Sequence, residues 1–388
     1  MARPKVLLAK PETETGMLSA RMTIWAAVVA AVATLAAFGA TAATKIRFTN
    51  FGPSSSASAR ALEKYAELIK TESKGELAFE FYHGGTLASG RGTLGAVRDG
   101  IADAGTIVDQ YTPRELATML TISELALLGR DGLPMAGAVN QTVLIDCKSC
   151  RDSYRQHNVV PLAFYSNMPY GLMCSKPVTT RAEMKGLRIR AVGPFGVWAA
   201  AMGATPVNTD AAEGYEAMQR GQIDCVSGDL TWLKNYSYWD VAKFVTQVDA
   251  GTYHGALIFG INETTWNKLS AAHKALLIKH LPFLIAEVMR NSLGEQGEIM
   301  AAASAKHGVK VLKPAADLLA ATEAHRGGEM VRAVKLAAGR GVKDPADIAS
   351  NFLKNVEAWS AMPFVKTRDL NAFEAELRKR VFERAKFD

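Results

Sequence analysis

Residues Lys185–Gly228, KGLRIRAVGPFGVWAAAMGATPVNTDAAEGYEAMQRGQIDCVSG, decide the fold of this chain of 388 residues. Three short strands are predicted at Leu187–Ala191, Thr205–Val207 and Gln222–Val226, with helical segments between them, which gives two successive β-α-β units. Open α/β sheets bind ligands beyond the carboxyl ends of such strands, and Arg190 lies at the end of the first one. Because the planar guanidinium matches two carboxylate oxygens, this stretch predicts a site for an organic acid.

The first half of the chain carries a similar alternation. Lys45–Phe51, Glu76–Tyr82 and Ala102–Val108 have the composition of strands, and helical segments separate them. The order β-α-β-α-β is typical of a parallel, doubly wound sheet, so the predicted fold class is α/β. The chain after Ser270 is predicted to be mostly helical, and further strands are predicted at 159–165, 172–175, 256–261 and 309–312.

The order and spacing of several short motifs resemble the solute-binding subunits of TRAP transporters, an extracytoplasmic family typified by C4-dicarboxylate binding. The family pattern K-G-L-K-I-R is similar to Lys185–Arg190, and the pattern L-G-A-x-P-V is similar to Met202–Val207. The resemblance covers nearly the whole chain after residue 42, because further segments match in order at 82–87, 100–105, 213–224, 261–262 and 266.

This resemblance implies a two-lobed clamshell of the periplasmic-binding-protein type, with two doubly wound sheets, hinge strands and long C-terminal helices. It also implies that the protein captures a small organic acid in the cleft and delivers it to the membrane permease subunits of a TRAP transporter. Crossings between the lobes are predicted near Asn167 and Gly255. The resulting boundaries are lobe I at 43–168 and 256–297, and lobe II at 169–255 and 298–388.

The N-terminal segment predicts export. Residues Met22–Thr44 carry no charge, Arg21 precedes them, and Ala40-Thr41-Ala42 matches a signal-peptide cleavage site. Residues 1–42 are therefore predicted to be a signal peptide, and the mature protein is expected in the periplasm. An uncleaved membrane anchor is the alternative, because the uncharged run is long enough to span a bilayer.

The composition favours a small anionic ligand. The chain has a formal net charge of +7, without a compact basic patch that contains interleaved aromatic residues, so nucleic acid is not indicated. None of the seven histidines has the spacing of a metal site, and no nucleophile elbow or phosphate loop is present. We therefore expect a monomer that is not an enzyme, with no metal, cofactor or nucleic-acid partner.

The four cysteines keep other interpretations open. Cys147 and Cys150 form a C-x-x-C motif, whereas Cys174 and Cys225 lie far apart. Disulfides are expected in an exported protein, but four cysteines allow three pairings. One alternative function is an exported thiol oxidoreductase that uses Cys147 and Cys150. Another is a ligand-binding sensor module with the same cleft.

Arg190 is the principal candidate ligand-binding residue, expected to clamp a carboxylate. Several members of the family that the chain resembles have a second arginine where this chain has Tyr170, and a ligand-contacting asparagine where it has Gly228. The loss of these polar groups favours a ligand with one carboxylate and an apolar or aromatic body. Trp232 and Trp198 fit core packing as well as they fit a pocket. The accompanying candidates are Tyr170, Trp232, Gly228, Asp229, Asn167, Phe51, Tyr111 and Trp198.

Overall fold

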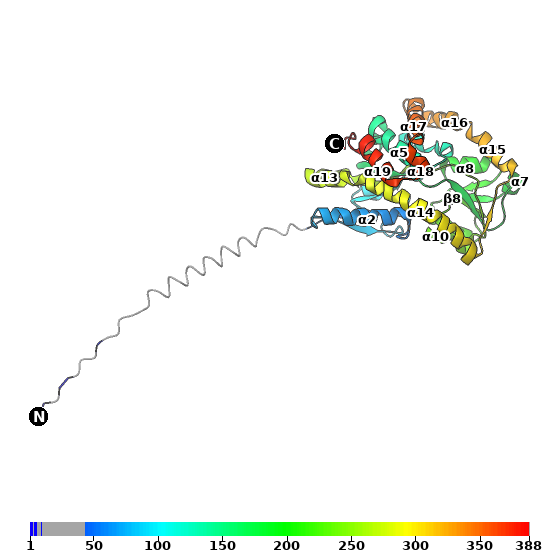
Figure 1. Ribbon diagram of the computed structural model, residues 1–388. Coiled ribbons are helices and arrows are strands. Elements are labelled where there is room, and N and C mark those ends of the chain that lie inside the picture. Colours follow the sequence, from blue (N-terminus) through cyan, green and yellow to red (C-terminus); the bar gives the residue numbers. More distant parts are fainter. Residues whose placement is uncertain (3, 6–8, 10–42, 388) are drawn as a thin grey trace. The chain divides into compact units, whose positions relative to one another are not determined.

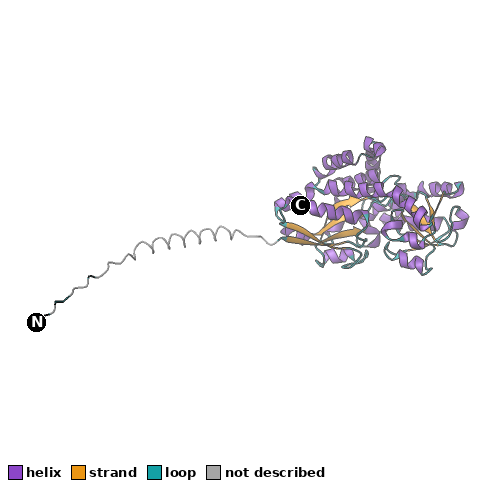
Figure 2. Cartoon of the chain, turned by 60° about the horizontal axis from the view of Figure 1, so that its bottom comes forward, coloured by secondary structure: helices purple, strands orange, loops and turns teal. Residues whose placement is uncertain are grey.

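Two separate β-sheets organise the structure, a computed structural model that describes residues 1, 2, 4, 5, 9 and 43–387. The predicted signal peptide at 1–42 lies outside these residues apart from isolated positions. From Thr44 onward the chain forms one unit in which helices surround the two sheets (Figure 1; Figure 2). Within the described part of the chain, none of the helices combines the length and the apolar character that crossing a bilayer requires.

The first sheet contains the strands predicted in the first half of the chain. Its members are β1 (Thr44–Thr49), β2 (Leu77–Tyr82), β3 (Ala104–Val108), β4 (Val159–Tyr165) and β10 (Ala256–Asn262), in the order β2-β1-β3-β10-β4. β1 is parallel to β2 and β3, whereas β10 is antiparallel to β3 and β4. The sheet is therefore mixed rather than purely parallel, because β10 returns from the second sheet beside the strand that leaves for it.

The second sheet is built around the stretch that decides the fold. Its members are β5 (Tyr170–Cys174), β6 (Arg188–Arg190), β7 (Thr205–Val207), β8 (Cys225–Asp229), β9 (Phe244–Thr246) and β11 (Lys310–Leu312), in the order β11-β9-β5-β8-β6-β7. β6 is parallel to β7 and β8, as the β-α-β pattern predicts, whereas β5 is antiparallel to β8 and β9. The sequence did not predict β9, a strand of three residues outside the β-α-β units that indicated β6 and β7.

Two loop connections join the sheets. Residues 166–169 lead from β4 to β5, and residues 247–255 lead from β9 to β10. The predicted crossings near Asn167 and Gly255 lie within these connections. β5 and β10 are therefore the hinge strands that the resemblance implied, since each receives the chain directly from the other sheet.

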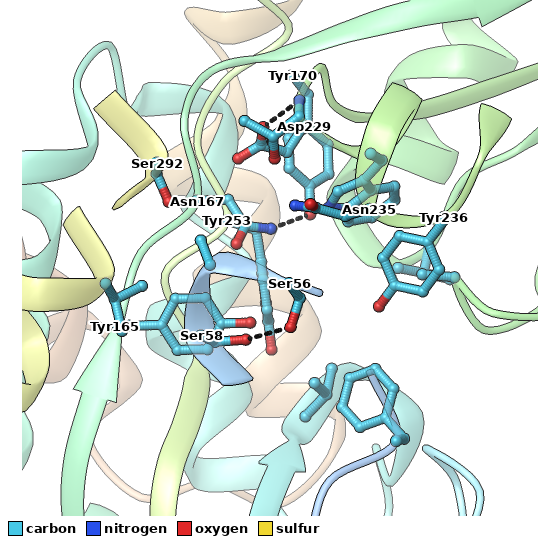
Figure 3. Close-up of a pocket in the computed structure, with 18 of the residues that line it drawn as sticks. Ser56, Ser58, Tyr165, Asn167, Tyr170, Asp229, Asn235, Tyr236, Tyr253 and Ser292 are labelled. Carbon is cyan, nitrogen blue, oxygen red and sulfur yellow. Dashed lines mark hydrogen bonds between the residues drawn. The ribbon is translucent and has the colours of Figure 1, made fainter. Parts of the chain in front are cut away.

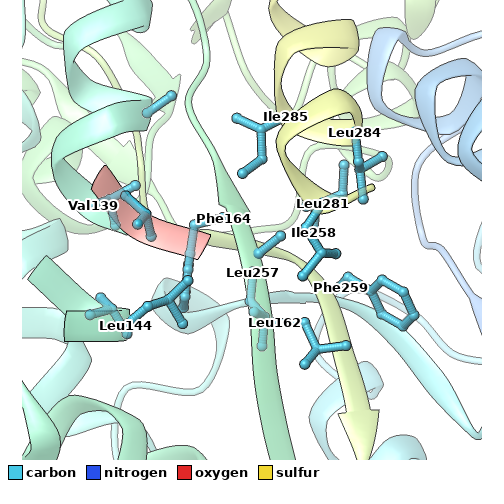
Figure 4. Packing of buried hydrophobic residues seen from close by; sticks show 14 of the residues in the cluster. Val139, Leu144, Leu162, Phe164, Leu257, Ile258, Phe259, Leu281, Leu284 and Ile285 are labelled. Atoms are coloured by element: carbon cyan, nitrogen blue, oxygen red, sulfur yellow. The ribbon is translucent and has the colours of Figure 1, made fainter. Parts of the chain in front are cut away.

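A large apolar cluster surrounds the first sheet. Helix α2 shows how the sequence builds it: Ser56 caps the helix by accepting from the Ala59 N–H, and Leu62, Tyr65 and Ile69 form its buried face. Figure 4 shows Phe164 of β4 and Leu257, Ile258 and Phe259 of β10 packed near Leu281 and Leu284 of the long helix that begins at Leu281. The helices are α2 (Ala57–Glu72), α3 (Thr93–Arg98), α4 (Ala117–Ser123), α5 (Gly132–Gln141), α6 (Lys148–Arg155), α12 (Glu263–Lys268) and α13 (Ala271–Lys279), with short 3₁₀ or π turns at Asp109–Tyr111, Ala126–Leu128 and Thr142–Asp146.

Apolar side chains cover both faces of the second sheet. Along β5, Leu172 and Cys174 belong to one apolar cluster and Met173 to another, because successive strand residues point to opposite faces. The surrounding helices are α7 (Arg181–Met184), α8 (Gly193–Ala201), α9 (Gly214–Gln219), α10 (Trp232–Asn235), α11 (Tyr238–Val241) and α15 (Ala316–Arg326).

The C-terminal helices connect the two halves of the molecule. Helix α14 (Leu281–His307) begins in the core of the first sheet and ends with Ile299 and Ala303 in a core of the second (Figure 1). After α15 the chain returns to the first sheet, where Phe352 and Trp359 are buried. This packing differs from the prediction that places all of 298–388 in lobe II, because a helical pattern does not reveal which sheet a helix covers. The returning helices are α16 (Glu329–Gly339), α17 (Pro345–Ser360), α18 (Pro363–Thr367) and α19 (Leu370–Leu377), followed by a π turn at Arg378–Phe382.

The cysteines form two disulfide bonds, one within each core. Cys147 pairs with Cys150 at the start of α6. Cys174 pairs with Cys225, and these two residues lie directly opposite each other on β5 and β8. The second bond therefore fastens the hinge strand β5 to the strand that runs beside β6.

We expect the Cys174–Cys225 bond to contribute more to stability than the Cys147–Cys150 bond. Replacing both Cys174 and Cys225 with alanine should lower the free energy of unfolding by about 2–5 kcal/mol, because the bond closes a long loop with a sequence separation of 51. The matched double variant at Cys147 and Cys150 opens a loop with a separation of only 3 and should lose less. Urea unfolding of the two variants measures both losses, and equal losses would contradict this expectation.

Candidate ligand-binding site

The structure contains a cavity at the carboxyl ends of strands from both sheets. Phe51 follows β1, Tyr111 follows β3, Arg190 ends β6 and Asp229 ends β8, and all four line this cavity. The cavity volume is about 60 Å³, measured as space for the centre of a water-sized sphere. Since one water needs roughly 10–15 Å³ on this measure, the cavity holds a few waters or one small molecule. Residues of both connections and of α14 complete the wall, namely Asn167, Tyr253, Val288 and Ser292.

Arg190 is buried in the wall of this cavity, with only 1% of its surface exposed. Its Nε donates to the Thr209 carbonyl at 3.0 Å, and its Nη2 donates to the Tyr111 hydroxyl at 3.1 Å. The guanidinium also lies 5.5 Å from the centre of the Trp232 ring, a cation–π distance. Among the described residues, no carboxylate forms an ion pair with Arg190, and Nη1 makes no hydrogen bond. Since arginine stays charged in proteins, the site holds a buried positive charge that an anion can neutralise.

Tyr111 joins the two halves of the site. Its hydroxyl oxygen accepts from Arg190 and also from the Ala211 N–H at 3.1 Å. Burial raises the pKa of Tyr111, so the hydroxyl keeps its proton. Because two donors already occupy the oxygen, its O–H remains available to donate to an anion beside Arg190.

Aromatic rings form much of the remaining wall. Tyr170 stacks on Phe195 with ring centres 4.3 Å apart, and Trp232 meets Tyr170 edge-on at 5.6 Å. On the opposite side, Phe51 and Tyr111 meet edge-on at 5.9 Å. Figure 3 shows Tyr165, Tyr170, Tyr236 and Tyr253 placed around the same space. Such a wall suits a ligand whose body is apolar or aromatic.

Polar residues at the hinge hold the wall in position. The Asn167 Nδ2 donates to the Tyr170 hydroxyl at 2.7 Å (Figure 3). The Asp229 carboxylate accepts from the Met168 N–H at 2.8 Å and from the Thr231 N–H and hydroxyl at 2.9 and 2.8 Å. Burial raises the pKa of Asp229, and these donors offset part of that effect. Asp229 therefore anchors the connection at 166–169 to the end of β8.

The cavity brings together most of the predicted site residues. Two of the predicted residues, Gly228 and Trp198, do not line the cavity. Gly228 lies beside Trp232, and a Cβ at this position would lie 2.4 Å from the Trp232 ring, so the glycine lets this ring pack on β8. Trp198 is fully buried, and its Nε1 donates to the Thr322 hydroxyl at 3.1 Å, so it packs α8 against α15. The predicted residues that line the cavity are Phe51, Tyr111, Asn167, Tyr170, Arg190, Asp229 and Trp232.

Sequence reasoning missed several residues of the wall. Gln110 and Asn235 each lie close in sequence to a predicted residue, Tyr111 and Trp232, so a wider window around those residues would have included them. Ser292 lies in the middle of the long helix α14, where nothing in the local sequence indicates a pocket. Tyr165, Tyr236 and Tyr253 were missed as well.

The two sheets thus border a cavity whose wall contains a buried arginine without an ion pair among the described residues. The chain belongs to the bacterial extracellular solute-binding proteins of family 7, whose family model matches residues 48–326. This membership confirms the resemblance to the TRAP solute-binding subunits. It favours solute binding over the thiol oxidoreductase alternative, and Cys147 and Cys150 are bonded to each other away from the cavity.

Curated relatives are distant. A solute-binding protein of Roseobacter denitrificans is 23% identical over 213 residues, which span 53% of this chain and 62% of that protein. The 2,3-diketo-L-gulonate-binding periplasmic protein of Escherichia coli is 25% identical over 254 residues, which span 64% of this chain and 75% of that protein.

Solved structures share the fold. A TRAP periplasmic solute-binding protein from Bordetella bronchiseptica, with bound (R)-mandelate and (S)-mandelate, has a TM-score of 0.71 at 20% identity and covers 81% of this chain and 99% of its own. A TRAP solute-binding protein from Rhodoferax ferrireducens, in complex with copurified benzoate, has a TM-score of 0.73 at 17% identity and covers 82% and 98%. These similarities confirm the α/β clamshell.

A buried acid lies behind the wall of the cavity. Asp109 follows β3 and is fully buried, and it accepts from the Tyr253 hydroxyl at 2.7 Å and from the Ser123 hydroxyl. Burial raises the pKa of Asp109 to about 7, although these hydrogen bonds act in the opposite direction and Glu124 adds a small increase. Tyr253 lines the cavity, so Asp109 supports one of its walls.

We expect Asp109 to make stability depend on pH. Between its unfolded pKa near 4 and its folded pKa of about 7, the native state retains a proton that the unfolded state has released. The stability of the wild type relative to Asp109→Asn should therefore be highest below about pH 4 and fall by at most about 1.4 kcal/mol per pH unit up to about pH 7. Urea unfolding of both proteins across this range measures the difference. Parallel curves would show that Asp109 does not titrate in this way.

Proposed function

We propose that this protein is a periplasmic receptor that captures a small monocarboxylate with an aromatic or other apolar body. It then delivers this ligand, chemically unchanged, to the membrane permease of a TRAP transporter. The observation that carries the proposal is Arg190, a buried cation without an acid partner among the described residues, in a cavity walled by aromatic rings. The uncharged N-terminal segment that ends in Ala40-Thr41-Ala42 supports export.

The charge of the site supports an anion with a single negative group. Arg190 is the only cationic side chain among the described residues that line the cavity. A carboxylate beside it would accept from Nη1 and from the Tyr111 hydroxyl, both of which are free to donate. In a cavity closed to water this attraction is stronger than at the surface. Mandelate and benzoate, the ligands of the two similar structures, each combine one carboxylate with one ring.

Closure of the lobes supports capture rather than catalysis. We propose that lobe I comprises 43–168, 256–297 and 329–387, and that lobe II comprises 169–255 and 298–328. Arg91 of lobe I, 5.7 Å from the centre of the Tyr111 ring, donates to the Asn208 carbonyl at 3.1 Å and to its side-chain oxygen at 3.0 Å. Together with the contact between Tyr111 and Arg190, this hydrogen bonding supports closure of both lobes around one ligand. Bending of the connections at 166–169 and 247–255 would open and close the two lobes.

Binding to organic acids tests the proposal. The purified mature protein should be stabilised by aromatic monocarboxylates, by about 2.7 kcal/mol at a concentration of 100 times the dissociation constant. Mass spectrometry should recover the ligand unchanged. Stabilisation by a sugar or an amine, with no response to any organic acid, would refute the proposal.

Replacement of Arg190 should weaken binding far more than it weakens the fold. Loss of one partner of a desolvated charge pair lowers affinity by about 30-fold to several thousand-fold, so Arg190→Ala should lose that much and Arg190→Lys somewhat less. The matched control is Arg188→Ala, on the same strand, because Arg188 is exposed and pairs with Asp224 at 3.1 Å. Calorimetric titration with benzoate measures all three. Wild-type affinity in Arg190→Ala would place the clamp elsewhere.

A second carboxylate on the ligand should weaken binding. It would be buried without a cation to neutralise it, which is costly. We expect benzoate to bind more tightly than benzene-1,3-dicarboxylate. The control is 3-nitrobenzoate, which has nearly the shape of the diacid but only one charge, and which should bind more tightly than the diacid. Competition titrations at one pH compare the three, and a preference for the diacid would contradict a single clamp.

A further inference from the structure

Two carboxamide side chains in the cavity wall have no hydrogen-bond partner among the described residues. Asn235 and Gln110 are each only 6% exposed. The Oδ1 of Asn235 and the Nε2 of Gln110 are buried atoms without a partner, and no other atom of either amide is hydrogen-bonded to the described part of the chain. Buried polar groups are nearly always paired, so two open amides at one cavity point to polar groups on the ligand.

The two amides face different parts of the cavity. Gln110 directly precedes Tyr111, and a Cβ at Gly193 would lie 2.7 Å from the Gln110 amide. Gly193 begins α8 just after β6, so Gln110 lies on the side of the cavity where Arg190 holds the carboxylate. Gln110 is therefore placed to contact the same end of the ligand as Arg190.

Asn235 lies toward the entrance instead. It ends α10, one turn after Trp232, and it lines both the inner cavity and the outer cleft that adjoins it. Phe51 and Tyr236 also line both spaces. Asn235 is thus a polar side chain among aromatic neighbours, near the entrance of the cavity. The body of the ligand would occupy this end, because its carboxylate would lie at Arg190. Figure 3 shows it between Tyr170 and Tyr236.

We propose that Asn235 determines specificity by hydrogen bonding to a second polar group on the ligand. This inference rests on the proposed function, because it assumes that Arg190 binds the carboxylate. A carboxamide offers both a donor and an acceptor, and a hydroxyl can match either. The ligand class is therefore a small aromatic monocarboxylate that carries a hydroxyl on its ring. A ligand without that group leaves the buried amide unpaired and binds less tightly.

Paired ligands and matched variants test this assignment. Calorimetric titration of the wild type should give a lower dissociation constant for 3-hydroxybenzoate than for benzoate, by about 10-fold or more. Asn235→Leu, which keeps the shape of the side chain, should lose this preference while benzoate affinity changes by less than about threefold. Gln110→Leu is the control, because it removes the other open amide and should weaken both acids by similar factors. Asn235→Ala provides a second variant, and thermal unfolding verifies that each protein is folded.

The outcomes separate the two proposals. If both acids bind through Arg190 but the wild type does not prefer the hydroxylated one, the role of Asn235 is wrong and the proposed function stands. The same holds if Asn235→Leu weakens both acids equally, or if Gln110→Leu alone abolishes the preference. If neither acid binds, or if Arg190→Ala binds both as tightly as the wild type, the proposed function fails, and the role of Asn235 fails with it.

Discussion

The candidate site depends on a guanidinium that is held out of water without an ion pair to any acid among the described residues. Arg190 meets the Thr209 carbonyl, the Tyr111 hydroxyl and the face of Trp232, all of which are neutral. These contacts orient the side chain but form no ion pair with it, and the carboxylate that acts on its charge, that of the buried Asp210, does so without direct contact. An anion that enters the cavity can therefore form a direct ion pair with this guanidinium.

The acid that lines the cavity, Asp229, forms no ion pair with Arg190. Its oxygens accept from Met168 and Thr231 instead. The two groups have separate roles as a result. Asp229 fastens the connection between the lobes to the second sheet, and Arg190 remains open toward the cavity. An ion pair between them would have stabilised the empty protein at the expense of its ligand.

The sequence predicted those parts of the molecule that are marked by neighbouring residues in the chain. The β-α-β units around Arg190, the strands of the first sheet and both connections were predicted because period and turn residues mark them. The membership of Phe352 and Trp359 in the first core was missed, since a helix carries no mark of the sheet it covers. Within the site, Trp198 and Gly228 were misplaced for a related reason. A buried tryptophan looks the same in a core and in a pocket, and a glycine that makes room for a neighbouring ring has no side chain to interpret.

The bond between Cys174 and Cys225 has a mechanical consequence. It ties β5, which receives the chain from lobe I, to β8, which carries Asp229 at its end. The two strands cannot slide past each other, so the second sheet and the arginine beside it must turn as a rigid lever. Helix α14, embedded in both cores, forms a further strut between the halves. A change in the angle between the two sheets would therefore have to bend 166–169, 247–255 and α14 together.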